Sequence, residues 1–275
     1  MTSKSRSLIS KCVITAFCGL LVLVYLFPYT WMVMTAFRSP VDSFERPPKF
    51  FFQPTLDGVR YLFEVVEFNG YLIGSTIVTL VTVLATIVIA VPAAYAVAHV
   101  EKNSKSFLIF ILVARMIPGI AIVVPVYLLA SQFRLLDTYQ VLVLMNIAFN
   151  LPFAIWLLRS FFIEVHPGLR EAALVDGCSE VQVLTLVMSP LVLGGIMATA
   201  VFVFIAVWNE FLFALVLSGP HTATAPIAVL GFRTAFGIQW DSMSAAAFLI
   251  SAPVIVFAFI MQRYLVQGLT MGSIK

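Results

Sequence analysis

Six long apolar runs constrain the fold of this chain more than any other feature. A helix that crosses the hydrocarbon core of a bilayer needs about 20 predominantly apolar residues. Hydrophobic residues make up 61% of the sequence and charged residues 11%, which leaves too few polar side chains to cover a soluble domain. The sequence therefore predicts a single all-α transmembrane domain over residues 1–275 with six membrane-spanning helices. These spans are expected at approximately 13–36, 71–98, 107–130, 139–158, 191–217 and 242–261.

The distribution of lysine and arginine predicts the orientation of these spans. If the N-terminus lies inside, the inner segments carry nine basic residues: Lys4, Arg6, Lys11, Lys102, Lys105, Arg159, Arg170, Arg263 and Lys275. The outer segments then carry six: Arg38, Arg46, Lys49, Arg60, Arg134 and Arg233. Because basic residues concentrate in cytoplasmic loops, both termini are expected in the cytoplasm. The same orientation places the polar segment 159–190 in the cytoplasm.

Segment 159–190 has the signals of two short helices joined by a sharp turn. Pro167 suits the first turn of a helix, where its missing N–H has no cost, and Gly177 suits the position just beyond the end, where φ is often positive. Ser179 and Gln182 have the spacing of a capping box, so a second helix should begin at Ser179 and run toward Pro190.

The same segment resembles the cytoplasmic EAA loop of ABC importer permeases. An E-A-A motif is followed after three residues by glycine, and nine further residues precede Val187 and the nearby proline. The resemblance covers nearly the whole chain and points to the carbohydrate-uptake class, the maltose-type second permease subunit. It implies that the loop sits in a cleft of an ATPase subunit and transmits its closure to the membrane helices. The residues expected to serve this coupling are Glu171, Ala172, Ala173, Asp176, Gly177 and Pro190.

Two further segments are similar to the same family. The C-terminal pattern closely resembles the end of maltose-type permeases, where the tail reaches toward the interface of the two ATPase subunits; its residues are Gly268, Leu269, Thr270 and Gly272. The outer segment 38–70 resembles the region before the second span, where an interfacial helix is common. It reads either as a docking surface for a solute-binding protein or as an aromatic belt at the bilayer interface. Gly74 stands where the family usually has asparagine.

The resemblance also implies the partners of the chain. The expected assembly is a type I ABC importer in the bacterial plasma (inner) membrane, in contact with lipid. It contains a homologous second permease subunit, two ATP-binding cassette subunits and one extracytoplasmic solute-binding protein, and it transports a sugar or sugar derivative. The chain has no GxxxxGK[ST] phosphate loop, so ATP and Mg²⁺ are expected on the ATPase and no cofactor on this chain. It has no HExxH or GxSxG motif, so we expect no metal site and no enzyme. Nothing in the sequence suggests nucleic acid.

Polar residues inside the predicted spans are candidates for the solute pathway, because intramembrane charges usually face a cavity. The candidates are Arg115, Asn146, Asn150, Asn209 and Glu210. By helical rise along continuous spans, Arg115 and Glu210 lie about 8 Å apart in depth. An ion pair between helices is therefore an equally good interpretation of these two residues. For Asn209, the alternative is hydrogen bonding to a facing helix or to water.

A proton-coupled secondary transporter, with Arg115 and Glu210 as the relay, is the alternative function. The sequence has no detectable internal repeat, which makes this alternative the weaker one. The solute is left open among disaccharides, oligosaccharides, polyols, sugar acids and glycerol phosphodiesters. The sequence also leaves open whether this subunit or its partner permease contacts the solute.

Overall fold

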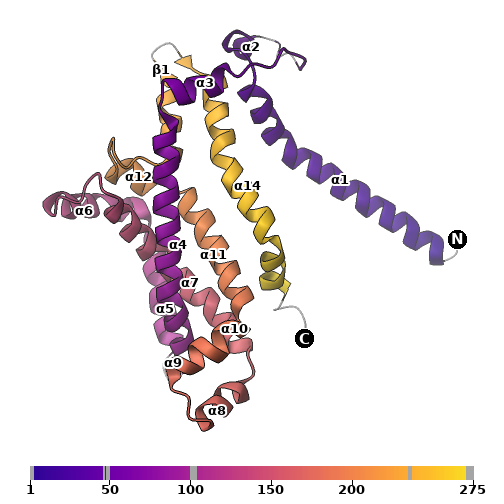
Figure 1. The fold of residues 1–275 in the computed structure, drawn as a ribbon. Coiled ribbons are helices and arrows are strands. Elements are labelled where there is room, and N and C mark those ends of the chain that lie inside the picture. Colours follow the sequence, from indigo (N-terminus) through magenta and orange to yellow (C-terminus); the bar gives the residue numbers. More distant parts are fainter. Residues whose placement is uncertain (1–2, 46, 48–49, 100–103, 235–236, 271–275) are drawn as a thin grey trace. The chain divides into compact units, whose positions relative to one another are not determined.

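A computed structural model describes residues 3–45, 47, 50–99, 104–234 and 237–270, which form two compact units. The first unit comprises residues 1–67 and 229–250, and the second comprises residues 68–228 and 251–275. Helices account for most of both units (Figure 1). The mainly helical fold agrees with the sequence prediction.

The first unit combines helices with one short β-hairpin. Its elements are α1 (Ser3–Ala36), α2 (Pro40–Phe44), α3 (Asp57–Glu64), the 3-10 helix η2 (Val229–Phe232), β1 (Arg233–Thr234), β2 (Gly237–Ile238) and the first part of α14 (Trp240–Thr270). The two strands pair antiparallel, with Arg233 opposite Ile238. Gly237 has a φ of 125°, a backbone conformation that residues with a Cβ rarely adopt.

Helix α3 is the short amphipathic helix that the family resemblance implied for the outer segment. Leu62 is fully buried, whereas Arg60 and Glu64 on the other face form an exposed i,i+4 ion pair at 3.7 Å. Gly58 lies so close to the start of α14 that an added Cβ would be 3.1 Å from the backbone carbon of Asp241. The helix is therefore held against α14 by its small and apolar face.

The second unit is a helical bundle with a polar hairpin at one end (Figure 1). Its elements are α4 (Phe68–His99), α5 (Ser104–Arg115), α6 (Gly119–Gln132), α7 (Tyr139–Glu164), α8 (Pro167–Val175), α9 (Glu180–Gln182), the π-helix η1 (Val183–Met188), α10 (Ser189–Leu191), α11 (Leu193–Trp208), α12 (Leu212–Leu217), α13 (Ala225–Ala228) and the remainder of α14. Helix α4 packs against both α7 and α11. Its buried positions include Thr82, Thr86, Ala90 and Ala94, whose small side chains allow neighbouring helices to approach closely.

Four helices are long and apolar enough to cross a bilayer: Val13–Ala36, Phe68–His99, Tyr139–Glu164 and Trp240–Gln262. A fifth candidate is the pair Glu180–Leu191 and Leu193–Trp208, which is bent by 80°. These correspond to the first, second, fourth, sixth and fifth expected spans. Six continuous spanning helices are therefore not what the described residues show.

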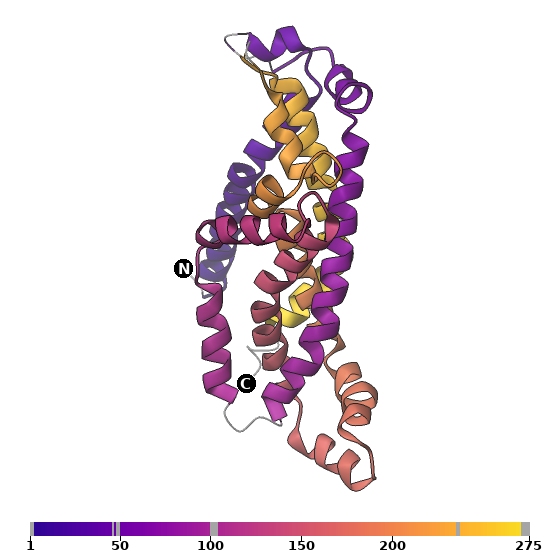
Figure 2. The same cartoon turned by 90° about the vertical axis from the view of Figure 1, so that its left-hand side faces the viewer.

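The third expected span, residues 107–130, is interrupted near its centre. It consists of α5 and α6, and Pro118 between them has an extended backbone with ψ of 131°. Figure 2 shows α6 turned across the direction of α5. Proline lacks the N–H that a continuous helix would use at this position, and its ring clashes with the carbonyl of the preceding turn. The first helix therefore ends at Arg115, and a new one begins at Gly119.

Gly74 and Ser75 anchor the loop before α13 to the start of α4. A Cβ on Gly74 would lie 2.6 Å from the backbone oxygen of Ala223, which leaves no room for any larger residue. The hydroxyl of Ser75 accepts a hydrogen bond of 2.8 Å from the Ala225 N–H. This close backbone approach explains why glycine occupies a position where the family usually has asparagine.

Asp137 fastens the turn between α6 and α7 to the segment after α12. Its Oδ1 accepts hydrogen bonds from the Gly219 N–H at 3.0 Å, the His221 N–H at 3.2 Å and the Thr222 hydroxyl at 2.8 Å. Burial alone raises the pKa of the Asp137 carboxyl, but these hydrogen bonds outweigh it and lower the pKa below its ordinary value of 3.8. The anchor is therefore an ionised carboxylate at neutral pH.

We expect this anchor to weaken in acid, because a group with a lowered pKa stabilises the fold above its ordinary pKa. That stabilisation is lost as the pH falls through the folded-state value. Asp137→Asn should reproduce the loss at neutral pH and speed amide hydrogen exchange at Gly219 and His221 by about tenfold, since a hydrogen bond to a charged group is removed. Equal exchange rates in the variant and the parent protein at pH 7 would contradict this role.

Candidate functional site

Helix α8 has the ends that the sequence predicted. Pro167 lies in its first turn, and the N-cap residue His166 accepts the Gly168 N–H on Nδ1 at 3.1 Å. Gly177 follows the helix with a φ of 88°. The Cys178 N–H donates to the Ala173 carbonyl at 3.0 Å, and the Gly177 N–H donates to Leu174 at 3.1 Å. These two bonds form a Schellman motif, which satisfies the last carbonyls and turns the chain sharply.

The second helix of the hairpin starts with the predicted capping box. The Ser179 hydroxyl accepts the Gln182 N–H at 3.4 Å, and the Gln182 side-chain oxygen accepts the Ser179 N–H at 2.8 Å. The helix then widens into η1 before reaching Pro190 in α10. Single turns of π-helix are rare in proteins, but those that occur often lie at functional sites. The hairpin thus leads through an irregular helix and an 80° bend directly into α11.

The two faces of α8 differ in what they expose. Glu171 and Ala172 are exposed, and so are the apolar side chains Leu169 at 46% and Val175 at 88%. Ala173 is only 8% exposed and belongs to the core of the second unit. Ala173, one of the expected coupling residues, therefore packs within this chain and does not lie on the exposed face of α8.

Sequence reasoning missed Leu169 and Val175 as members of the exposed face. Together with Ala172 they are spaced by three residues, which places them on one side of a helix and was a signal available in the sequence. The remaining coupling candidates Asp176, Gly177 and Pro190 are also exposed. An exposed apolar stripe with a carboxylate at its edge is typical of a helix that docks against another protein.

The two intramembrane charges do not meet. The Arg115 guanidinium lies 4.9 Å from the centre of the Phe153 ring. Glu210 caps α12, because its carboxylate oxygens accept the Phe213 N–H at 2.7 Å and the Ala214 N–H at 3.0 Å. Within the described part of the chain, no ion pair joins Arg115 and Glu210. The interpretation of these residues as a helix-to-helix ion pair is therefore wrong in this structure.

The three asparagines make hydrogen bonds within their own helices. Asn146 is 2% exposed and donates to the Leu142 carbonyl, and Asn150 is 6% exposed and donates to the Asn146 carbonyl. Asn209 is exposed and donates to the Ile205 carbonyl. Burial favours a packing role for Asn146 and Asn150, whereas Asn209 and Arg115 are accessible. The assignment of all five polar residues to a solute pathway stays a prediction.

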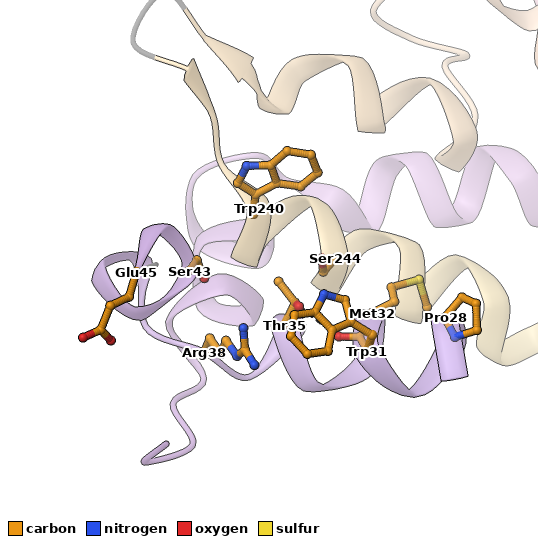
Figure 3. Close-up of a pocket in the computed structure, with 9 residues that line it drawn as sticks. All are labelled: Pro28, Trp31, Met32, Thr35, Arg38, Ser43, Glu45, Trp240 and Ser244. Atoms are coloured by element: carbon orange, nitrogen blue, oxygen red, sulfur yellow. Dashed lines mark hydrogen bonds between the residues drawn. The ribbon is translucent and has the colours of Figure 1, made fainter. Parts of the chain in front are cut away.

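The first unit contains a cavity of about 440 Å³ with an aromatic lining (Figure 3). Its walls come from the end of α1, from α2 and the residue after it, and from the start of α14: Pro28, Trp31, Met32, Thr35, Arg38, Ser43, Glu45, Trp240 and Ser244. The Arg38 guanidinium lies 4.7 Å from the centre of the Trp31 ring and 5.0 Å from that of Phe52. Three residues of the outer segment, Arg38, Ser43 and Glu45, thus line this cavity, and both interpretations of the segment stay predictions.

The C-terminal motif lies at the end of α14. Gly268, Leu269 and Thr270 form its last residues, and Gly272 lies outside the described residues.

The long apolar helices, with an exposed polar hairpin between two of them, are those of a multi-pass membrane protein. Residues 86–271 match the family model described as "Binding-protein-dependent transport system inner membrane component". The chain belongs to this family of ABC transporter permeases, which are transport components and not enzymes.

Individual relatives agree with this assignment. The chain is 62% identical over 275 residues to a probable ABC transporter permease, y4oR, of Sinorhizobium fredii, with 100% of this chain and 99% of the relative covered. It is 34% identical to the trehalose/maltose permease MalG of Thermococcus litoralis, covering 93% of this chain and 94% of that protein. A solved bacterial alginate ABC importer matches with a TM-score of 0.78 and 19% identity over 96% of this chain and 98% of that one. The chain is therefore an ABC transporter permease, and the predicted family is confirmed.

Proposed function

We propose that this chain forms half of the translocation pathway of an ATP-driven carbohydrate importer and couples to an ATPase through segment 159–190. The observation that carries the proposal is helix α8, which is rigidly capped at both ends and exposes Leu169, Ala172 and Val175 beside Glu171. In the proposed orientation both termini and this hairpin lie in the cytoplasm, where the ATPase subunits are.

The proposed assembly contains a homologous second permease, two ATP-binding cassette subunits and a solute-binding protein. A related alginate importer has been solved in complex with a periplasmic protein bound to an alginate pentasaccharide, which supports the binding-protein partner. ATP and Mg²⁺ are held by the ATPase subunits and not by this chain. The end of α14, with Gly268, Leu269 and Thr270, and Gly272 beyond it, contacts the interface of those subunits.

ATP-driven closure of the ATPase dimer pulls on α8 and switches the membrane helices from inward-facing to outward-facing. Such a switch requires that ATP binds more tightly to the complex in one state than in the other. Named relatives transport trehalose or maltose and diacetylchitobiose, so the proposed substrate class is a small oligosaccharide. The family assignment does not favour the alternative of a proton-coupled secondary transporter.

Crosslinking from α8 tests this function. Cysteine placed at Ala172 in a background without the native cysteines should trap the ATPase subunit when the complete transporter is treated with a short bifunctional reagent. Cysteine at Val41, which is 82% exposed on α2, should not trap it. If Ala172 never captures the ATPase, or if an impermeant reagent labels it from outside intact cells, the proposed coupling fails.

Arg115 provides a separate test of the solute pathway. Arg115→Met removes a cation–π contact with Phe153 that contributes roughly 0.5–1 kcal/mol at an accessible site, so the variant should accumulate normally in the membrane. Uptake should fall by about tenfold if the guanidinium hydrogen-bonds the passing solute. Uptake is measured with the sugar that most raises the melting temperature of the transporter's solute-binding protein. Failure of the variant to accumulate would instead assign Arg115 a structural role.

A further inference from the structure

Three polar side chains from three helices meet at the base of the hairpin. Tyr95 comes from the last turns of α4, Arg170 from α8 and Glu180 from the start of α9. The Tyr95 hydroxyl donates to Glu180 Oε2 at 2.5 Å, and Arg170 Nε donates to the Tyr95 oxygen at 3.1 Å. Arg170 Nη2 donates to the other carboxylate oxygen, Oε1 of Glu180. The three contacts form a closed triangle, which we call the α4–α8–α9 triad.

Tyr95 is the fixed corner of this triad. It is 4% exposed, and its ring lies 5.8 Å from Phe162 of α7 in an edge-to-face arrangement and 5.3 Å from His99. The side chains of Arg170 and Glu180 are more accessible, at 20% and 45%. An accessible ion pair alone contributes little to stability. A buried hydroxyl that bonds both members restricts their geometry, since each charge-assisted bond is directional.

The triad orients the exposed face of α8. Arg170 directly precedes Glu171 and Ala172, and its side chain points the opposite way, toward Tyr95. Ala173 and Leu174 pack on the same inward side. The docking helix is therefore tied to α4 by the contact between Arg170 and Tyr95, while it packs against η1. Helix α4 in turn packs against both α7 and α11.

We infer that Tyr95, Arg170 and Glu180 are positioning residues that make α8 and α4 move as one body when the ATPase pulls on α8. The inference rests on the proposed function. The triad contacts neither solute nor ATP and acts only by holding the docking helix rigid relative to the bundle. Without the triad, the hairpin rotates about its connecting turns when α8 is displaced. A smaller part of the displacement is then transmitted to α4.

A spin-label distance measurement on the complete transporter tests the inference directly. Labels at Pro167 on α8 and Val88 on α4 are both at exposed positions outside the docking stripe, and the three native cysteines are replaced. The probe is ATP and Mg²⁺ with vanadate. In the otherwise unaltered protein we expect one narrow distance distribution that is the same before and after trapping. In Tyr95→Phe and Arg170→Met, the distribution should broaden or shift on trapping.

The second readout is the number of sugar molecules transported per ATP hydrolysed. Tyr95→Phe should lower this ratio by about tenfold, in line with the loss of a hydrogen bond to a charged group, while the ATPase subunit still co-purifies. A variant that merely folds less well would lower transport and hydrolysis in proportion. The matched control is Tyr139→Phe, which removes a hydroxyl bonded to the His221 carbonyl at 3.3 Å, away from α8. Arg170→Lys keeps the charge but not the planar pair of donors. It should therefore retain only part of the parental ratio of sugar transported to ATP hydrolysed.

The outcomes separate the triad from the proposed function. If the unaltered chain binds no ATPase and vanadate traps nothing, the proposed function has failed. If trapping occurs but the Pro167–Val88 distance changes in the unaltered chain, α8 moves independently of α4 and the triad proposal is overturned. It is also overturned if Tyr95→Phe keeps both the narrow distribution and the parental transport ratio.

Discussion

Val175→Glu is expected to weaken ATPase binding strongly while leaving the permease folded. Val175 is 88% exposed, and a surface substitution of this kind changes the free energy of unfolding by less than about 0.5 kcal/mol. In the proposed complex the side chain is buried against the ATPase, where a carboxylate would lose its hydration without gaining a partner. Central interface positions contribute about 2 kcal/mol or more, so the affinity should fall by roughly thirtyfold or more.

Co-purification of the ATPase with the tagged permease measures this effect, and thermal unfolding of the purified permease shows that the fold is retained. Val41→Glu is the matched control, because Val41 is 82% exposed on another helix and should leave ATPase binding intact. Normal co-purification of the Val175→Glu variant would show that the exposed stripe of α8 is not the docking surface.

Gly195→Ala is expected to destabilise the bundle strongly, because α7 and α11 are in contact at this glycine. A Cβ on Gly195 would lie 2.3 Å from Cγ of Phe161, and the Phe161 side chain is itself only 6% exposed. Cγ is the ring carbon bonded to Cβ, so the buried ring cannot move aside without displacing its neighbours. Forcing an extra carbon into a packed core costs about 1–3 kcal/mol, and Gly195→Val should cost more.

The melting temperature and the yield of folded protein in detergent measure this cost. Gly70→Ala is the control, since nothing lies within 4 Å of a Cβ at that helical position and alanine favours a helix by about 1 kcal/mol over glycine. Combining Gly195→Ala with Phe161→Leu should recover part of the lost stability, as expected for two residues that interact directly. An unchanged melting temperature for Gly195→Ala alone would refute the close contact.

The polar hairpin shows how far local sequence signals reach. Pro167, Gly177, Ser179 and Gln182 predicted both helix ends and the turn between them, and the structure confirms each one. These signals succeed because they concern hydrogen bonds within a few residues of one another. They could not predict that α8 would turn Ala173 inward and expose Val175, because the orientation of a helix depends on contacts with distant segments.

The intramembrane charges show the opposite limit. Helical rise placed Arg115 and Glu210 at depths that permitted an ion pair, on the assumption that each lay inside one continuous helix. Both residues instead lie beside breaks, Arg115 at the end of α5 and Glu210 between α11 and α12. Glu210 then finds its partners in the N–H groups of the next helix. Depth along an assumed straight helix therefore gave a misleading distance.

The sequence by itself determined that the chain lies in a lipid bilayer, that it is helical and which family it belongs to. These conclusions follow from the apolar runs, the local helix signals and the spacing of the EAA motif. Only the tertiary structure decided where the third and fifth apolar runs break, which face of α8 is presented, and that Tyr95, Arg170 and Glu180 meet across 75 to 85 residues of chain. The physical reason is that packing and side-chain hydrogen bonds between helices depend on relative orientation in space. The periodicity of residues along one segment does not predict how that segment is oriented relative to the others.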